Sequence, residues 1–83
     1  MSSKSFAFAL EQSQLPPQEQ LTLIVIADCC AEHFGFEEAV KVVCKYTSLN
    51  AGEVRLAIKH LHDALLVVRI DAAKGLYRVA VSS

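Results

Sequence analysis

The feature that most constrains this fold is the run from Asn50 to Val81, in which a helical pattern passes directly into two strand patterns. Asn50 is a residue type that caps helix N-termini, and Glu53 three positions later completes the spacing of a capping box. Apolar side chains then recur at helical spacing. A helix is therefore expected over residues 50–65. Its inward stripe consists of Val54, Ala57, Ile58, Leu61 and Leu65.

A β-hairpin is predicted directly after this helix, over residues 66–81. Its two strands, 66–71 and 76–81, are rich in β-branched residues and are joined by a four-residue loop that contains glycine. Symmetric pairing across that loop places Arg69 opposite Arg78. Like charges directly opposite each other repel, so an anion such as a phosphate between the two arginines would relieve the repulsion.

Two further helices are expected before this segment. Residues 37–46 carry apolar side chains at helical spacing and form the second of them. The first spans residues 17–34, because Pro17 suits the first helical position and Gly35 suits a helix stop. This first helix is apolar nearly all round, so it must be buried on more than one side.

Residues 1–14 form an N-terminal extension whose two phenylalanines must be covered by other parts of the structure. A short helix is expected here, with a strand as the less favoured alternative. Either this extension and the hairpin cover the first helix within one chain, or a second copy or another protein does so. We expect a homodimer. The residues predicted at the dimer or partner interface are Phe6, Phe8, Leu10, Leu23, Val25 and Ile26.

The length of 83 residues predicts a single domain over residues 1–83. The hydrophobic fraction of 53% is high for so short a chain, which favours a dense core or a surface covered by another chain. Apolar runs such as Leu23–Ala27 are far shorter than the roughly 18 residues of a membrane span. The first five residues lack the apolar core of a signal peptide, so we expect a cytoplasmic protein that does not contact a membrane.

The net charge of −1 hides an asymmetry between the two parts of the chain. Residues 1–38 carry one basic and six acidic side chains, whereas residues 39–83 carry seven basic and three acidic ones. A basic second half favours a nucleic-acid face there. An ordinary solvated surface is the alternative, because seven basic residues in 45 do not make a dense patch.

Residues 37–65, two helices joined by a tight turn, satisfy the helix-turn-helix pattern, and the basic hairpin follows as a two-stranded wing. The sequence resembles the small winged helix-turn-helix domains of bacteriophage replication-initiator and regulator proteins. The resemblance covers most of residues 15–81 and consists of hydrophobic spacings. The segments that carry it are the leader Leu15–Leu21, the helix end Ile26–Asp28, the turn Thr47–Asn50 and the recognition helix Val54–Leu61.

The resemblance implies a mainly α fold, with a three-helix core and a two-stranded wing. It also implies a regulator or replication accessory of phage or mobile-element type. Such a protein binds double-stranded DNA with residues 50–65 in the major groove and the hairpin on the backbone. Ala51 and Gly52 offer no side-chain donor, so Arg55 is the strongest candidate for a guanine contact. The candidate DNA-binding residues are Lys41, Lys45, Ser48, Asn50, Arg55, Lys59, His62, Arg69, Lys74 and Arg78.

A protein-interaction module is the alternative function. It is favoured by the apolar first helix, by the lack of side-chain donors at the start of the recognition helix and by the acidic first half of the chain. In that case the winged-helix scaffold would bind a host protein complex and inhibit or modulate it.

No catalytic, cofactor or metal site is predicted. His60 and His62 are two residues apart and project to different sides of a helix, whereas helical zinc sites use i, i+4 spacing. The three cysteines show no C-x-x-C spacing and are expected to be buried free thiols. Cys29 and His33 are four residues apart on the first helix and are expected to form a packing pair. We therefore expect that the protein is not an enzyme.

Overall fold

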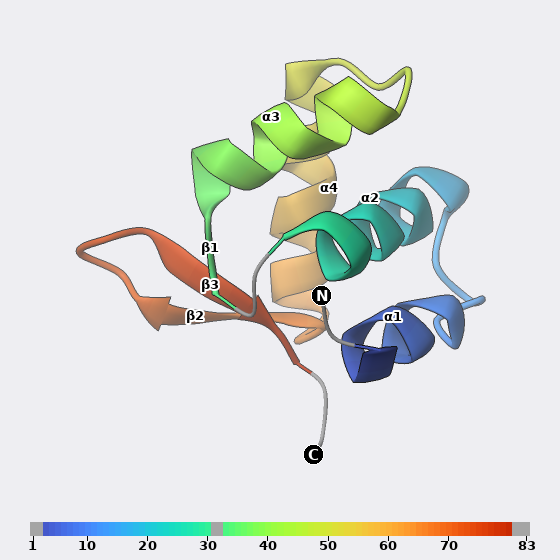
Figure 1. Cartoon of the computed structure of the whole chain (residues 1–83), viewed down its shortest axis with the longest axis horizontal. Helices are drawn as coiled ribbons and strands as arrows, with labels where there is room; N and C mark the ends of the chain where they lie inside the picture. The colour runs from blue at the N-terminus through green and yellow to red at the C-terminus, as the bar shows by residue number, and fades with distance from the viewer. Residues whose placement is uncertain (1–2, 31–32, 81–83) are drawn as a thin grey trace.

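The structure, a computed structural model, describes residues 3–30 and 33–80 (Figure 1). The described residues form four helices: α1 (Ser3–Leu10), α2 (Pro17–Cys29), α3 (Phe36–Tyr46) and α4 (Ala51–Asp63). They also form three short strands, β1 (Phe34–Gly35), β2 (Val67–Asp71) and β3 (Leu76–Val79). The strands make one antiparallel sheet in the order β1-β3-β2. The fold is therefore mainly helical, and the predicted two-stranded hairpin gains a third strand.

The helices predicted over residues 37–46 and 50–65 are confirmed as α3 and α4. The capping box at the start of α4 forms as the sequence predicts. The amide of Glu53 donates to Oδ1 of Asn50 at 2.8 Å, and the amide of Asn50 donates to Oε1 of Glu53 at 3.0 Å. The short N-terminal helix is also confirmed, as α1.

The end of α4 is a Schellman motif, in which Leu65 takes a conformation that usually belongs to glycine. The amide of Leu66 donates to the carbonyl of Leu61 at 2.9 Å, and that of Leu65 to the carbonyl of His62 at 3.0 Å. Leu65 has a φ angle of 63°, and its side chain is 74% exposed. Leu65 therefore lies beyond the helix, and its predicted place on the inward stripe is wrong.

The first predicted helix, residues 17–34, ends earlier than expected. α2 stops at Cys29, and Phe34 instead begins β1, where it pairs with Tyr77 of β3. Gly35 pairs with Leu76 and directly precedes α3, so it does not stop a helix. The prediction was wrong because the partner of Phe34 lies near the other end of the chain, and local periodicity does not report such a pairing.

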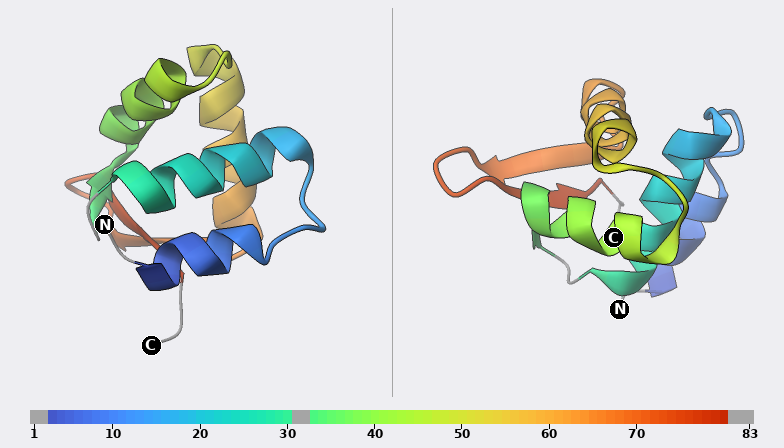
Figure 2. Two further views of the ribbon diagram at one scale, coloured as in Figure 1. Left: turned by 45° about the vertical axis from the view of Figure 1, so that its right-hand side comes forward. Right: turned by 90° about the horizontal axis from the view of Figure 1, so that it is seen from above.

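The hairpin projects beyond the helices, as Figure 1 and the right-hand view of Figure 2 show. Its register differs from symmetric pairing. Arg69 lies opposite Tyr77, Val68 lies opposite Arg78, and a bulge interrupts β2 between Arg69 and Asp71. The predicted Arg69–Arg78 pair is therefore wrong, as is the anion site inferred between them. The extra residue of the bulge shifts β2 by one position, so the two arginines point to opposite faces of the sheet.

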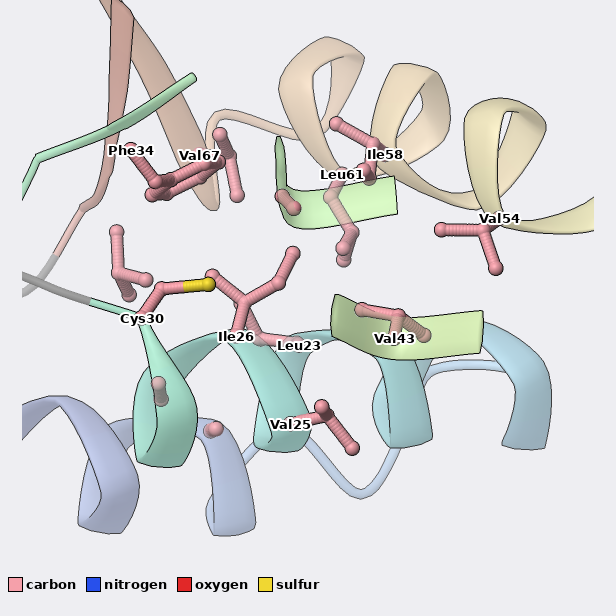
Figure 3. Close-up of a cluster of buried hydrophobic side chains, with 14 of the residues drawn as sticks. Leu23, Val25, Ile26, Cys30, Phe34, Val43, Val54, Ile58, Leu61 and Val67 are labelled. Carbon is pink, nitrogen blue, oxygen red and sulfur yellow. The ribbon is translucent and has the colours of Figure 1, made fainter. Parts of the chain in front are cut away.

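The core is built around α2, which packs against α1, α3 and α4. Figure 3 shows Leu23 and Ile26 of α2 on the side that faces Val43 and Leu61. Both residues are fully buried, and Val25 is 9% exposed. These three side chains therefore cannot form the predicted partner interface.

The helix α1 covers the side of α2 for which a second chain was expected. Ala9 is fully buried there, and Phe8 packs against the same core. The alternative in which the N-terminal extension and the hairpin cover the apolar helix within one chain is therefore confirmed for the extension. The other sides of α2 pack against α3 and α4 rather than against the hairpin. Leu10 is 50% exposed. The predictions for the Phe6 side chain, residues 31–32 and Val81 lie outside the described part of the chain. Among the described helices, none is long and apolar enough to cross a bilayer.

Candidate nucleic-acid interface

A groove of about 590 Å³ lies between the outer face of α4 and the sheet, and it is open to solvent. Three basic side chains line it: Arg55 and Lys59 from α4, and Arg69 from β2. The remaining lining residues are Phe36, Leu56, Ile58, His62, Asp63 and Tyr77. The groove therefore brings together four of the predicted DNA-binding residues, the three basic ones and His62.

The backbone explains why these side chains converge. Arg55, Lys59 and His62 are spaced four and three residues apart, so they share one face of α4. Arg69 pairs with Tyr77 across the hairpin, so both side chains lie on the same face of the sheet. The guanidinium of Arg69 lies 5.8 Å from the centroid of the Tyr77 ring, and this cation–π contact holds it beside the groove.

Tyr77 is the centre of an aromatic cluster that borders the groove. Its ring centroid lies 6.1 Å from that of Phe34, 5.9 Å from that of Phe36 and 5.9 Å from that of His62. These partners belong to β1, α3 and α4, so the ring fixes the hairpin against both helices. Sequence reasoning missed Phe36 and Tyr77. In the sequence, the aromatic Tyr77 directly precedes the basic Arg78, and this aromatic–basic pair could have indicated that Tyr77 belongs to the site.

Arg55, the predicted guanine-reading residue, already binds a carboxylate. Its Nη2 donates to Oε1 of Glu37 at 2.9 Å, and its Nε donates to Oε2 of the same group at 3.2 Å. The two side chains are 50% and 60% exposed. Hydrogen bonds from Arg55 lower the pKa of Glu37, and those to Glu37 raise the pKa of Arg55. Sequence reasoning missed Glu37, because no local pattern pairs it with a residue on the next helix.

The two lysines of α3 do not line the groove. Lys41 and Lys45 are exposed on the outer side of that helix. The Nζ of Lys45 lies 5.5 Å from the centroid of the Tyr46 ring, so its nearest aromatic contact is local. The groove and these lysines are therefore two separate basic surfaces. Glu37 is near both, because it accepts hydrogen bonds from Arg55 and the charge of Lys41 helps to lower its pKa.

The other predicted residues are spread around the groove. Ser48 is exposed in the turn before α4, and the Oδ1 of Asn50 is occupied by the capping bond to Glu53. Lys74 is exposed in the hairpin loop, where its amide donates to Oδ1 of Asp71 at 3.2 Å. Asn50 therefore acts as a helix cap, and Lys74 is free to extend from the wing.

Arg78 lies apart from the groove. It follows Tyr77 in β3, so its side chain points to the opposite face of the sheet, where Val68 is its cross-strand neighbour. The sequence prediction that Arg69 and Arg78 act on one surface is therefore wrong. The groove takes one arginine from the hairpin.

The remaining histidines and cysteines lie outside the groove. Nδ1 of His60 lies 2.9 Å from Oε2 of Glu19 and links α4 to α2. Groups of three or more histidine, cysteine or acidic side chains that could hold a metal ion are absent from the described residues. The prediction that all cysteines are buried holds for Cys30 and is wrong for Cys29, which is exposed.

The pKa values of the adjacent thiols Cys29 and Cys30 are both raised. Burial is the main cause that raises the pKa of Cys30, to about 11, and it also raises the pKa of Cys29. These shifts disfavour the thiolate, which is the form in which a cysteine acts as a nucleophile. The predicted packing pair of Cys29 with His33 is also wrong, because α2 ends at Cys29 and His33 is exposed in a bend.

Comparisons with models of protein families, with curated protein sequences and with solved structures found no match to this chain. What the protein binds is therefore inferred from the chemistry of the groove.

Proposed function

We propose that this protein is a winged helix-turn-helix protein that binds double-stranded DNA, with α4 as the recognition helix and the β2–β3 hairpin as the wing. Two features of the fold support this assignment. The helices α3 and α4 are consecutive and joined by a short turn, as in helix-turn-helix motifs. The hairpin follows α4 directly and projects beyond the helices (Figure 1).

The observation that carries the proposal is the convergence of Arg55, Lys59 and Arg69 on one groove. Arg55 and Lys59 come from α4 and Arg69 from β2, the next element of the chain, and the turn between the two elements brings the three side chains to one groove. The major groove of DNA is about 12 Å wide and admits an α-helix. Lys59 and Arg69 would contact phosphates, which position the protein on the duplex, and Arg55 would reach a base edge.

The hairpin loop adds a further contact to the DNA backbone. Lys74 is exposed at the loop, beyond the helices. Each phosphate that a basic side chain neutralises contributes about −0.9 to the slope of log affinity against log salt. Lys59, Arg69 and Lys74 therefore predict a slope of about −3.

Fluorescence anisotropy of a labelled random duplex, titrated with the protein at low and at physiological salt, tests the proposal. The double variant Arg55→Ala with Lys59→Ala should abolish binding. The control is Lys41→Ala with Lys45→Ala, which removes the same charge from exposed positions outside the groove. Equal losses in the two double variants would show that α4 is not the DNA-contacting helix.

The biological role, the cellular compartment and the oligomeric state of the protein are also proposals. We propose a regulator or replication accessory of phage or mobile-element type, acting in the cytoplasm as a homodimer. Because Leu23, Val25 and Ile26 are internal, the dimer surface moves to the exposed end of α1, where Leu10 is 50% exposed. A soluble monomer throughout a dilution series in light scattering would refute the dimer.

A protein partner is the second candidate, and Leu56 favours it. This side chain is 53% exposed on the groove side of α4, near the apolar lining residues Phe36 and Tyr77. An exposed leucine contributes nothing to phosphate contacts, whereas an acidic amphipathic segment of a host protein would cover it and pair with the basic rim. Such a complex would survive molar salt and would be lost in Leu56→Ala.

A further inference from the structure

We propose that Glu37 is a specificity-determining residue of the groove, because its carboxylate occupies the Nε–Nη2 edge of Arg55 and must leave before that edge can bind DNA. This inference rests on the proposed DNA-binding function. It concerns which DNA group Arg55 binds, a base edge or a phosphate. Glu37 acts on this choice from α3 and is not itself one of the side chains that line the groove.

The geometry of the pair makes the carboxylate a direct competitor of the ligand. Both bonds from Arg55 to Glu37 come from one edge of the guanidinium, the edge with Nε and Nη2. A guanine or a phosphate is also bound through two parallel N–H donors. The same donors cannot serve the carboxylate and a DNA acceptor together, so the ion pair must open for this edge to bind.

The pair is able to open without disturbing the fold. Both side chains are at least half exposed, and exposed ion pairs contribute little to folding. Lys41 lies one turn after Glu37 on the same face of α3, and its charge already helps to lower the pKa of Glu37. The carboxylate therefore has a second cationic neighbour when it leaves Arg55.

After the ion pair opens, the carboxylate still discriminates between DNA groups, because Glu37 lies in the first turn of α3 and remains near Arg55. Its negative charge repels a phosphate at that position. It repels the edge of guanine less strongly, because that edge carries two acceptor atoms but no net charge. Glu37 thus suppresses phosphate binding by Arg55 and leaves base contact as the favoured use of that residue.

Glu37→Gln removes the competing charge, and Glu38→Gln is its control. Glu38 is exposed, is the next residue of α3 and takes no part in the pair, so both variants lose one negative charge from the same helical turn. The probe is a labelled duplex that contains only A·T pairs, at low salt. Glu37→Gln should bind it about threefold to tenfold more tightly than the parent chain, and Glu38→Gln less than about twofold more tightly.

Two further measurements distinguish the effect of Glu37 on Arg55 from the general effect of removing one negative charge. The salt slope should steepen by about 0.9 in Glu37→Gln alone, because Arg55 then neutralises one more phosphate. In an Arg55→Ala background, the effect of Glu37→Gln should vanish. Thermal unfolding of each variant, followed by circular dichroism, shows that all of them are folded.

The possible results distinguish a failure of the proposed role of Glu37 from a failure of the proposed DNA binding. Equal tightening by Glu37→Gln and Glu38→Gln, or an effect of Glu37→Gln that survives in Arg55→Ala, would overturn the inference while DNA binding stood. Absence of binding by the parent chain and by every variant would overturn the DNA-binding proposal, and the inference with it.

Discussion

Phe34 and Tyr77 lie opposite each other in β1 and β3, and their ring centroids are 6.1 Å apart. Phe34 is 2% exposed and belongs to the core, whereas Tyr77 lines the groove. The pair therefore connects the stability of the core to the position of the hairpin. A change at one ring is expected to alter the groove through the other.

Phe34→Ala should lower the free energy of unfolding by about 3–5 kcal/mol, because a fully buried aromatic ring is replaced by a cavity. Urea unfolding measures this loss. Tyr77→Phe is the control, since it keeps the ring and should change the stability by less than about 0.5 kcal/mol. A loss below about 1 kcal/mol in Phe34→Ala would mean that β1 does not anchor the sheet as described.

Leu65→Gly should stabilise the protein by about 1 kcal/mol. Leu65 has a φ angle of 63°, a conformation that costs residues other than glycine about 1–2 kcal/mol, and its exposed side chain loses few contacts. The thermal midpoint should rise by about 4–8 °C. Leu65→Ala keeps a Cβ in the same conformation, so a rise of equal size in that variant would assign the gain to the lost leucine side chain instead.

Thr22→Val should also stabilise the protein, by about 1 kcal/mol. Thr22 is fully buried on α2, and its hydroxyl has no hydrogen-bond partner among the described residues. An unpaired buried hydroxyl costs about 1–3 kcal/mol, and valine has nearly the same shape without it. Chemical unfolding provides the comparison with Thr22→Ser, which keeps the hydroxyl and loses a methyl group. Destabilisation by valine would show that the hydroxyl is satisfied.

The ion pair of Glu37 with Arg55 should make a small contribution to stability that disappears in acid. Hydrogen bonds from Arg55 lower the pKa of Glu37 in the folded chain, whereas in the unfolded chain it is about 4.3. The folded state thus binds this proton less readily. The stabilisation is complete above the unfolded value and is lost as the pH falls through the folded-state value.

Denaturant midpoints of the parent chain and of Glu37→Gln provide the measurement. The parent should be slightly more stable near neutral pH, and the difference should shrink towards about pH 3. A difference that is the same at both pH values would show that the carboxylate charge does not contribute.

The sequence predicted those parts of the fold that local patterns determine. The stripe of Val54, Ile58 and Leu61 identifies α4 as a helix, and the capping box at Asn50 places its start almost to the residue. It did not predict β1, because Phe34 and Gly35 form a strand only by pairing with β3. The end of α4 was also misplaced, since a leucine takes the left-handed position that glycine would have marked.

The candidate site was predicted in part for a similar reason. Arg55, Lys59 and His62 share a helix face, and helical spacing alone identifies them. The partners that define the groove come from elsewhere: Arg69 reaches it because of a bulge, and Glu37 because α3 packs against α4. Such relations depend on tertiary packing, which periodicity does not encode. The apolar character of α2 was recognised, but its burial by α1 required the three-dimensional arrangement.

The most direct test of DNA binding by the groove is a titration of ¹⁵N-labelled protein with a short duplex at low salt, in which the amide chemical shifts are followed. We predict that the perturbed amides cluster at Arg55, Lys59, His62, Arg69 and Tyr77, around the groove between α4 and the hairpin. The amides near Leu10 and Leu21, on α1 and α2, should stay unchanged. Perturbations centred on α1 and α2, or none at all, would contradict DNA binding by this groove.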